Sequence, residues 1–234
     1  MSYPAPILNL DFANAKQLIH PAVAFSRASA RSYVDSTGTS RTARAGVPRF
    51  THASATGESL GLMVDPQETI ESVVYATDVC SVDLTRLQDA ARNPLWTGTE
   101  GTIVVDAIAP PTTDESFVMM IGDANNRISI DRTAGGGIDF YAYGGSAVTG
   151  IIHSPTVGAS NRFRFCYGFA SGAAKLSVNG GNVLSATGLV VPSPLSTLWI
   201  GSLVGVLTWG GTFRSVQVYN RLIPDAYFPA LSTM

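Results

Sequence analysis

Charged residues are scarce in this chain: they make up 14% of its 234 residues, against about 25% in an average globular protein. Lysine is almost absent, since Lys16 and Lys175 are the only two, while arginine occurs thirteen times. Exposed helices favour Lys, Glu and Ala, so this composition excludes a mostly helical protein. The apolar fraction of 45% excludes an intrinsically disordered chain, which combines low hydrophobicity with high charge.

Cysteine and histidine are also few. Cys80 and Cys166 allow one bridge, but their spacing is typical neither of a disulfide framework nor of a zinc site. His20, His52 and His153 are scattered, without the spacing that a metal site needs. We therefore expect neither a metal nor a cofactor.

Long apolar runs are missing as well. No charged residue occurs between Lys175 and Arg214, but prolines and an Asn-Gly-Gly turn interrupt that stretch, so it lacks the roughly 20 apolar residues of a spanning helix. The start, MSYPAPILNLDF, has no basic region followed by an apolar one. We expect no signal peptide and no insertion into a membrane.

The charges that are present form blocks. Residues 16–52 carry a net charge of +5, residues 53–125 carry −10 and residues 126–234 carry +4. Such blocks either steer association between subunits or let the basic segment fold back on the acidic one, and we favour the second interpretation. The basic block offers only Phe25, Tyr33 and Phe50 as aromatic residues, so we expect no nucleic-acid partner.

From Gly101 onward, short apolar segments alternate with turn residues such as Gly144-Gly145 and Asn179-Gly180. Many short strands separated by tight turns predict an all-β fold, a jelly-roll β-sandwich. A short helix is expected over Asp225–Leu231, after Pro224. Ten segments have the composition of strands: Thr102–Ala109, Ser116–Ile121, Arg127–Asp131, Gly137–Tyr143, Ala147–His153, Arg162–Phe169, Ala173–Val178, Asn182–Ser185, Thr197–Ile200 and Phe213–Tyr219.

The N-terminal part follows another pattern. A strand is expected at Ile7–Phe12, and the polar tract over residues 26–60 shows no helical period, so we expect an extended arm with one or two hairpins. Val79–Leu87 is compatible with a short helix or a loop. We therefore divide the chain into an arm, residues 1–68, and a sandwich, residues 69–234.

Two stretches carry a resemblance to known proteins. Phe25–Met63, marked by Arg27-Ala28-Ser29, Val47-Pro48-Arg49-Phe50 and Thr56-Gly57-Glu58-Ser59-Leu60-Gly61-Leu62, resembles a segment that recurs in bacteriophage virion proteins. Trp96, Glu100-Gly101-Thr102, Lys175–Gly180 and Val216–Asn220 resemble a concanavalin A-like (laminin-G-like) jelly roll. The resemblance covers residues 25–63 and 96–231, and Glu68–Glu71 departs from the Arg-Thr-Asn stretch common in the family.

The resemblance implies a non-enzymatic surface component of a phage or phage-like particle: a tail fibre, a head spike or a decoration protein. Its place is then the virion surface, after assembly in the bacterial cytoplasm, with capsid or tail proteins and further copies of itself as partners. The arm would anchor it, with Arg27, Arg49 and Phe50 as packing or docking residues. The alternative function is a lectin-like module that recognises host surface polysaccharide.

One strand offers a candidate carbohydrate site. In Ile138–Tyr143 the alternation turns Asp139, Tyr141 and Tyr143 to the outer side. Glycan sites combine an aromatic face with a carboxylate or amide that holds sugar hydroxyls. Trp209 stands beside two glycines in an expected loop and completes the set. Alternatively, the tyrosines cover a second sheet or a neighbouring subunit.

Catalytic patterns are weak. Gly57-Glu58-Ser59-Leu60-Gly61 matches G-x-S-x-G by letters, but a nucleophile elbow needs a following helix, which Pro66 disfavours. Paired carboxylates at alternate positions of one strand, as a sandwich glycosidase requires, are missing. We therefore expect no catalytic residue. Asp123-Ala124-Asn125-Asn126 is predicted as a plain hairpin turn rather than a calcium loop.

Overall fold

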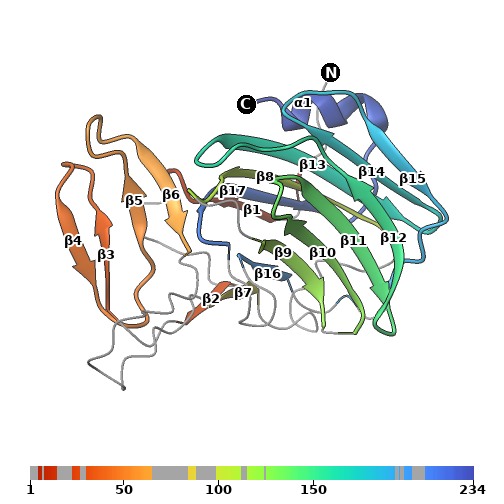
Figure 1. Cartoon of the computed structure of the whole chain (residues 1–234), viewed down its shortest axis with the longest axis horizontal. Helices are drawn as coiled ribbons and strands as arrows, with labels where there is room; N and C mark the ends of the chain where they lie inside the picture. The colour runs from red at the N-terminus through yellow and green to blue at the C-terminus, as the bar shows by residue number, and fades with distance from the viewer. Residues whose placement is uncertain are drawn as a thin grey trace.

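The computed structural model describes residues 5–6, 8–14, 23–26, 30–64, 84–87, 99–111, 115–123, 125–192, 195, 198–201 and 209–234. Within these residues the chain forms two large antiparallel sheets, a separate two-stranded hairpin and one short helical segment near the C-terminus (Figure 1). Among the described residues, no helix is long and apolar enough to cross a membrane.

The first sheet has eight strands and contains the chain's first and last strands. Strand β1 (Leu8–Asp11) pairs with β17 (Thr212–Tyr219) beside the main path of the sheet. The path runs β15 (Leu184–Thr187), β14 (Ala173–Val178), β13 (Arg162–Ala170), β8 (Gly101–Ile108), β17, β6 (Ser59–Met63) and β5 (Phe50–His52).

The second sheet has seven strands and is built mainly from consecutive hairpins. Its order is β12 (Ala147–His153), β11 (Ile138–Gly144), β10 (Arg127–Arg132), β9 (Ser116–Gly122), β16 (Leu198–Ile200), β7 (Leu84–Leu87) and β2 (Val23–Ser26).

The main core lies between the two sheets and is rich in aromatic side chains. Strand β13 buries every second residue, Phe163, Phe165, Tyr167 and Phe169, as its alternating sequence predicts. Phe140 of the opposite sheet meets Phe165 edge-on at 5.2 Å and stacks on Tyr167 at 4.9 Å between ring centroids. These contacts hold the two layers together.

The C-terminal segment covers part of the outer face of the eight-stranded sheet. A 3-10 turn (Asp225–Tyr227) leads into α1 (Phe228–Ser232), close to the predicted helix. Phe228 and Ile223 form a second apolar cluster with Val104, Cys166 and Tyr219, which point outward from this sheet. Beyond that segment, polar residues such as Asp106, Arg162 and Gln217 line a groove on the same face.

The N-terminal segment forms two hairpins, within the range predicted. Strands β5 and β6 join the eight-stranded sheet through β17, whereas β3 (Arg31–Val34) and β4 (Ser40–Ala43) form a sheet of their own at the edge of the molecule (Figure 1). Strands β1 and β2 also pair within the large sheets. The division at residue 68 therefore does not coincide with a break in strand pairing.

The strand predictions after Gly101 agree with the structure: all ten expected strands are present, with small differences at their ends. Between residues 79 and 87 the expectation of a helix or a loop was wrong, because Leu84–Leu87 is a strand. It is held between β16 and β2, and such pairing with distant segments is invisible in local sequence. Residues 79–83 lie outside the described residues.

Candidate functional site

The predicted sugar-binding strand has the alternation expected of it. Strand β11 buries Ile138, Phe140 and Ala142 in the core, so Asp139, Tyr141 and Tyr143 share its other side. Tyr141 and Tyr143 are partly exposed, whereas Asp139 is only 7% exposed. The three residues thus lie together on the outer face of the seven-stranded sheet.

Neighbouring strands extend this group into a cluster. Strand β10 pairs with β11, so Arg127 lies opposite Tyr143, Ser129 opposite Tyr141 and Asp131 opposite Asp139. On the other side, β12 places His153 opposite Asp139. We call this group the carboxylate–tyrosine cluster: Arg127, Ser129, Asp131, Asp139, Tyr141, Tyr143 and His153. The alternation within β11 predicted three of its members, Asp139, Tyr141 and Tyr143. It could not predict the other four, because strand register cannot be read from one strand.

Hydrogen bonds fix Asp139. The Tyr141 hydroxyl donates to Asp139 Oδ2 at 3.0 Å, and His153 Nδ1 lies 2.9 Å from Oδ1. Both carboxylate oxygens are therefore engaged, and the Tyr141 ring is held in one orientation.

Asp131 is less well satisfied. It is 7% exposed, and Ser129 Oγ donates to its Oδ2 at 3.3 Å. Its Oδ1 is buried and, in the described part of the chain, has no hydrogen-bond partner. A buried acceptor without a donor is costly, so this environment disfavours the ionised form of Asp131.

Aromatic rings form the rest of the cluster. The Tyr141 and Tyr143 rings lie 5.8 Å apart at 37°, and the Arg127 guanidinium carbon stands 3.8 Å from the Tyr143 ring centre. The cation fixes Tyr143 from one side. Two adjacent rings of this kind offer apolar faces to the C–H surface of a sugar.

Burial shifts the titration of two members. Desolvation raises the pKa of Asp131 to about 7, with weaker opposing effects from the Ser129 hydroxyl and the Arg127 charge. Desolvation and the bond to Asp139 raise the pKa of Tyr141 to about 12. Tyr141 therefore remains a hydroxyl donor at neutral pH, while Asp131 changes its protonation there.

Trp209 does not belong to this site, contrary to the sequence prediction. It is 1% exposed and packs against Phe163 and Phe213, with ring centroids 5.8 and 6.1 Å away. Its backbone N–H donates to the Gly201 carbonyl at 2.8 Å. The adjacent glycines suggested an exposed loop, but burial of so large an aromatic surface decides its position.

The residues proposed for attachment lie inside the N-terminal segment. Arg49 is 1% exposed, and its Nη1 donates to the Ser32 carbonyl at 2.9 Å. Phe50 is buried next to Phe12, with ring centroids 6.5 Å apart. Both side chains therefore pack within this chain, and Arg27 lies outside the described residues.

The weaker motifs resolve into structural elements. Ser59 begins an antiparallel strand, β6, and Arg214 donates to its carbonyl, so it does not stand at a strand-to-helix elbow. Asp123 Oδ1 accepts from the backbone N–H groups of Asn125 and Asn126 at 2.8 and 2.7 Å, which is the expected hairpin turn. In the described ranges, no group of three or more His, Cys, Asp or Glu side chains could hold a metal ion.

Cys166 has a free thiol beneath the C-terminal segment, where burial raises its pKa. A thiol of this kind is a poor nucleophile. Cys80 lies outside the described residues.

Solved structures share this architecture. Domain 4 of AbnA, a GH43 extracellular arabinanase from Geobacillus stearothermophilus, in complex with arabinotriose, matches over 98% of both chains with a TM-score of 0.63 and 11% identity. The CBM40 of the Ruminococcus gnavus IT-sialidase, bound to alpha2,3 sialyllactose, matches over 62% of this chain and 87% of its own, with a TM-score of 0.51 and 16% identity. The NanB sialidase from Streptococcus pneumoniae matches over 59% of this chain and 25% of its own, with a TM-score of 0.50 and 16% identity.

By sequence, neither a family model nor a curated protein matches the chain. The structural likenesses, together with the strand order, establish its architecture. The chain is an all-β jelly-roll sandwich. The predicted fold class is therefore confirmed, and the match to Domain 4 of AbnA extends over the N-terminal hairpins as well as the sandwich.

Proposed function

We propose that this protein is a non-catalytic, lectin-like module that binds host surface polysaccharide through the carboxylate–tyrosine cluster. The observation that carries the proposal is the pair of partly exposed tyrosine rings beside two carboxylates on the outer face of one sheet. The rings are partly exposed and offer a stacking surface to a sugar. The sugar-bound structures of similar fold support the same class of ligand.

The test is binding of the purified 234-residue protein to intact bacterial cells with and without their surface polysaccharide. Saturable binding that disappears with the polysaccharide is the expected result. Binding that is unchanged on stripped cells, or no binding at all, would contradict the proposal.

Residue variants then locate the site. Tyr141→Ala and Tyr143→Ala should each weaken binding about tenfold, since stacking of one ring is worth about 1 kcal/mol or more. Tyr33→Ala, on the separate β3–β4 hairpin, is the matched control and should bind as the wild type does. Equal binding by all three variants would place the sugar elsewhere.

We also propose that the module is displayed on a phage particle, anchored by its N-terminal segment. Two observations favour this: the resemblance of residues 25–63 to virion proteins, and the β3–β4 hairpin, which projects from the edge of the sandwich with Arg41 on its exposed surface (Figure 1). Co-sedimentation of the tagged protein with particles tests the proposal. A protein found only in the soluble fraction of a particle-producing culture would contradict it.

A further inference from the structure

The outer face of the eight-stranded sheet carries a polar groove on the side not covered by the C-terminal segment. Its volume is about 280 Å³, and strands β13, β8, β17 and β1 form its floor. Its lining includes Arg164, Asp106, Ser215, Gln217, Asn9 and Asp11, and among the residues that line it none is aromatic. This groove faces away from the carboxylate–tyrosine cluster, which lies on the other sheet.

Strand register arranges the floor of the groove in rows. Arg164 stands opposite Asp106, Asp106 opposite Ser215, and Ser215 opposite Asp11. Three interstrand spacings make this row about 14 Å long. The next row includes Gln217 opposite Asn9. A cation, two carboxylates, a hydroxyl and two amides are thus presented on one surface.

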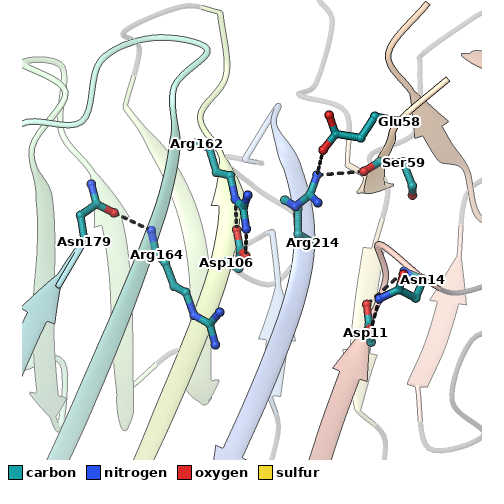
Figure 2. A network of polar contacts seen from close by, with 9 residues as sticks. All are labelled: Asp11, Asn14, Glu58, Ser59, Asp106, Arg162, Arg164, Asn179 and Arg214. Atoms are coloured by element: carbon teal, nitrogen blue, oxygen red, sulfur yellow. Dashed lines mark hydrogen bonds and ion pairs between the residues drawn. The ribbon is translucent and has the colours of Figure 1, made fainter. Parts of the chain in front are cut away.

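Most of the charges in the groove are already engaged. Arg162 donates to both oxygens of Asp106, at 2.9 and 2.6 Å. Arg214 donates to the Ser59 carbonyl at 2.8 Å and to Glu58 at 3.4 Å. Asp11 accepts from the backbone N–H and the side-chain amide of Asn14, at 3.0 and 2.7 Å. Figure 2 shows these contacts side by side along the strands.

Arg164 is the exception. Its backbone N–H donates to Asn179 Oδ1 at 2.8 Å (Figure 2), whereas its guanidinium forms no ion pair with Asp11 or Asp106 of the groove. Its Nε is buried and, among the residues described, has no hydrogen-bond partner. The side chain is only partly exposed and lines the groove, so water does not fully replace the missing acceptor. Because Nε is buried, an anion that enters the groove meets Arg164 through its two Nη groups.

We infer that this groove is a second ligand site and that it binds a carboxylate-bearing sugar residue, such as a hexuronate, with Arg164 as the partner of the carboxylate. A guanidinium pairs with a carboxylate through two parallel hydrogen bonds. The amides of Asn9 and Gln217 and the hydroxyl of Ser215 are suited to sugar hydroxyls. Without an aromatic platform among its lining residues, the groove has little to offer a neutral sugar.

The charge balance selects the kind of anion. Three arginines and the two carboxylates of Asp11 and Asp106 leave the lining with one net positive charge. A single carboxylate matches that charge, whereas a phosphate dianion would be repelled by the neighbouring aspartates. The site does not depend on the carboxylate–tyrosine cluster, because no residue is shared between them.

Calorimetric titration of the 234-residue protein tests the inference with three probes: a trigalacturonate, the neutral trisaccharide with its carboxylates reduced to alcohols, and inorganic phosphate. The trigalacturonate should bind, and more weakly as salt is added, while the other two should bind at least about tenfold more weakly. Phosphate binding that equals or exceeds uronate binding would overturn the choice of ligand. Absence of uronate binding would overturn the site.

Variants assign the binding to Arg164. Arg164→Gln should weaken uronate binding about tenfold or more, and Arg164→Lys, which keeps the charge but loses the fork, should lie between it and the wild type. Arg221→Gln removes an exposed charge outside the groove and is the matched control. Thermal unfolding of each variant shows whether it is folded. If Arg164→Gln does not fold, the comparison of Arg164→Lys with the wild type tests the inference.

The two sites are separated by one more comparison. Tyr141→Ala should leave uronate binding unchanged, because Tyr141 lies on the opposite sheet. If Tyr141→Ala abolishes uronate binding and Arg164→Gln does not, the acidic sugar binds the carboxylate–tyrosine cluster and the groove is not a site. The reverse pattern supports the groove whether or not the cluster binds neutral glycans.

Discussion

Asp131 is the member of the carboxylate–tyrosine cluster whose protonation changes near neutral pH. Burial raises its pKa from 3.8 to about 7, so between these values the folded protein holds a proton that the unfolded chain has released. The free energy of unfolding therefore falls as pH rises through this window. Asp131→Asn has no carboxyl to titrate here, so its free energy of unfolding should not fall in this way. Between pH 4 and pH 8 the stability of this variant relative to the wild type should therefore rise by up to about 4 kcal/mol.

Denaturant unfolding of both proteins at several pH values measures that difference. Arg127, Glu115 and Asp139 also act on Asp131, but they are present in both proteins and largely cancel. Parallel stability curves for the two proteins would mean that Asp131 ionises normally in the folded state. Glycan binding offers a second readout, because the charge of the Asp131 carboxyl beside the tyrosine rings changes near pH 7.

Trp209 is a residue of the core, and its substitution should show this. Trp209→Ala should cost about 3 to 5 kcal/mol of stability, because it leaves a large cavity next to Phe163 and Phe213. Trp209→Phe should cost much less, since the indole Nε1 has no hydrogen-bond partner in the described part of the chain. Trp209→Phe should bind polysaccharide as the wild type does. A clear loss of binding would mean that Trp209 takes part in the ligand site after all.

The attachment of strand β6 to β17 depends on one glycine. Gly61 has a φ of +105°, and a Cβ there would lie 2.0 Å from the backbone oxygen of Phe213. Gly61→Ala should therefore separate the β5–β6 hairpin from the sheet and destabilise the protein by about 2 kcal/mol or more. Limited trypsin digestion, with cleavage expected after Arg49, which is buried while the hairpin stays attached, and denaturant unfolding measure the two effects.

Gly46→Ala is the matched control for that change. Gly46 also has a positive φ, +71°, but a Cβ there meets nothing within 4 Å. Gly46→Ala should lower the stability by about 1 kcal/mol through backbone strain alone, and the hairpin should stay attached to the sheet. Equal effects of the two substitutions would mean that the close approach to Phe213 is unimportant.

Local patterns were sufficient for most strands and insufficient for their arrangement. The alternation in Arg162–Phe169 and in Ile138–Tyr143 indicated both the strands and their buried sides, because one face of each meets the core. The neighbours of a strand depend on long-range pairing, so the sequence did not reveal that Asp131 stands opposite Asp139. For the same reason it did not place Leu84–Leu87 in a sheet or align Arg164 with Asp106.

The N-terminal segment combines parts with different structural roles. Leu10, Phe12 and Phe50 belong to the main core, and the burial of each contributes about 2 kcal/mol or more. Their sum is comparable to the whole stability of a domain, about 5 to 15 kcal/mol. Deletion of residues 1–60 should therefore leave a chain that does not fold stably, whatever its effect on particle attachment.

Removal of the β3–β4 hairpin alone should separate attachment from folding. Arg31 and Ala43 are paired across the hairpin, so two glycines can join Ala30 to Arg44 in place of residues 31–43. Among the described residues, three hydrogen bonds to β5 and its preceding residue are lost: from Val34 N–H to Thr51, from Arg49 to the Ser32 carbonyl, and between His52 and the Val34 carbonyl. At about 1 kcal/mol for each hydrogen bond, the variant should be less stable by about 3 kcal/mol but folded, and it should still bind polysaccharide.

If the hairpin is the anchor, the variant should not co-sediment with particles. Co-sedimentation at the wild-type level would show that attachment uses another part of the chain.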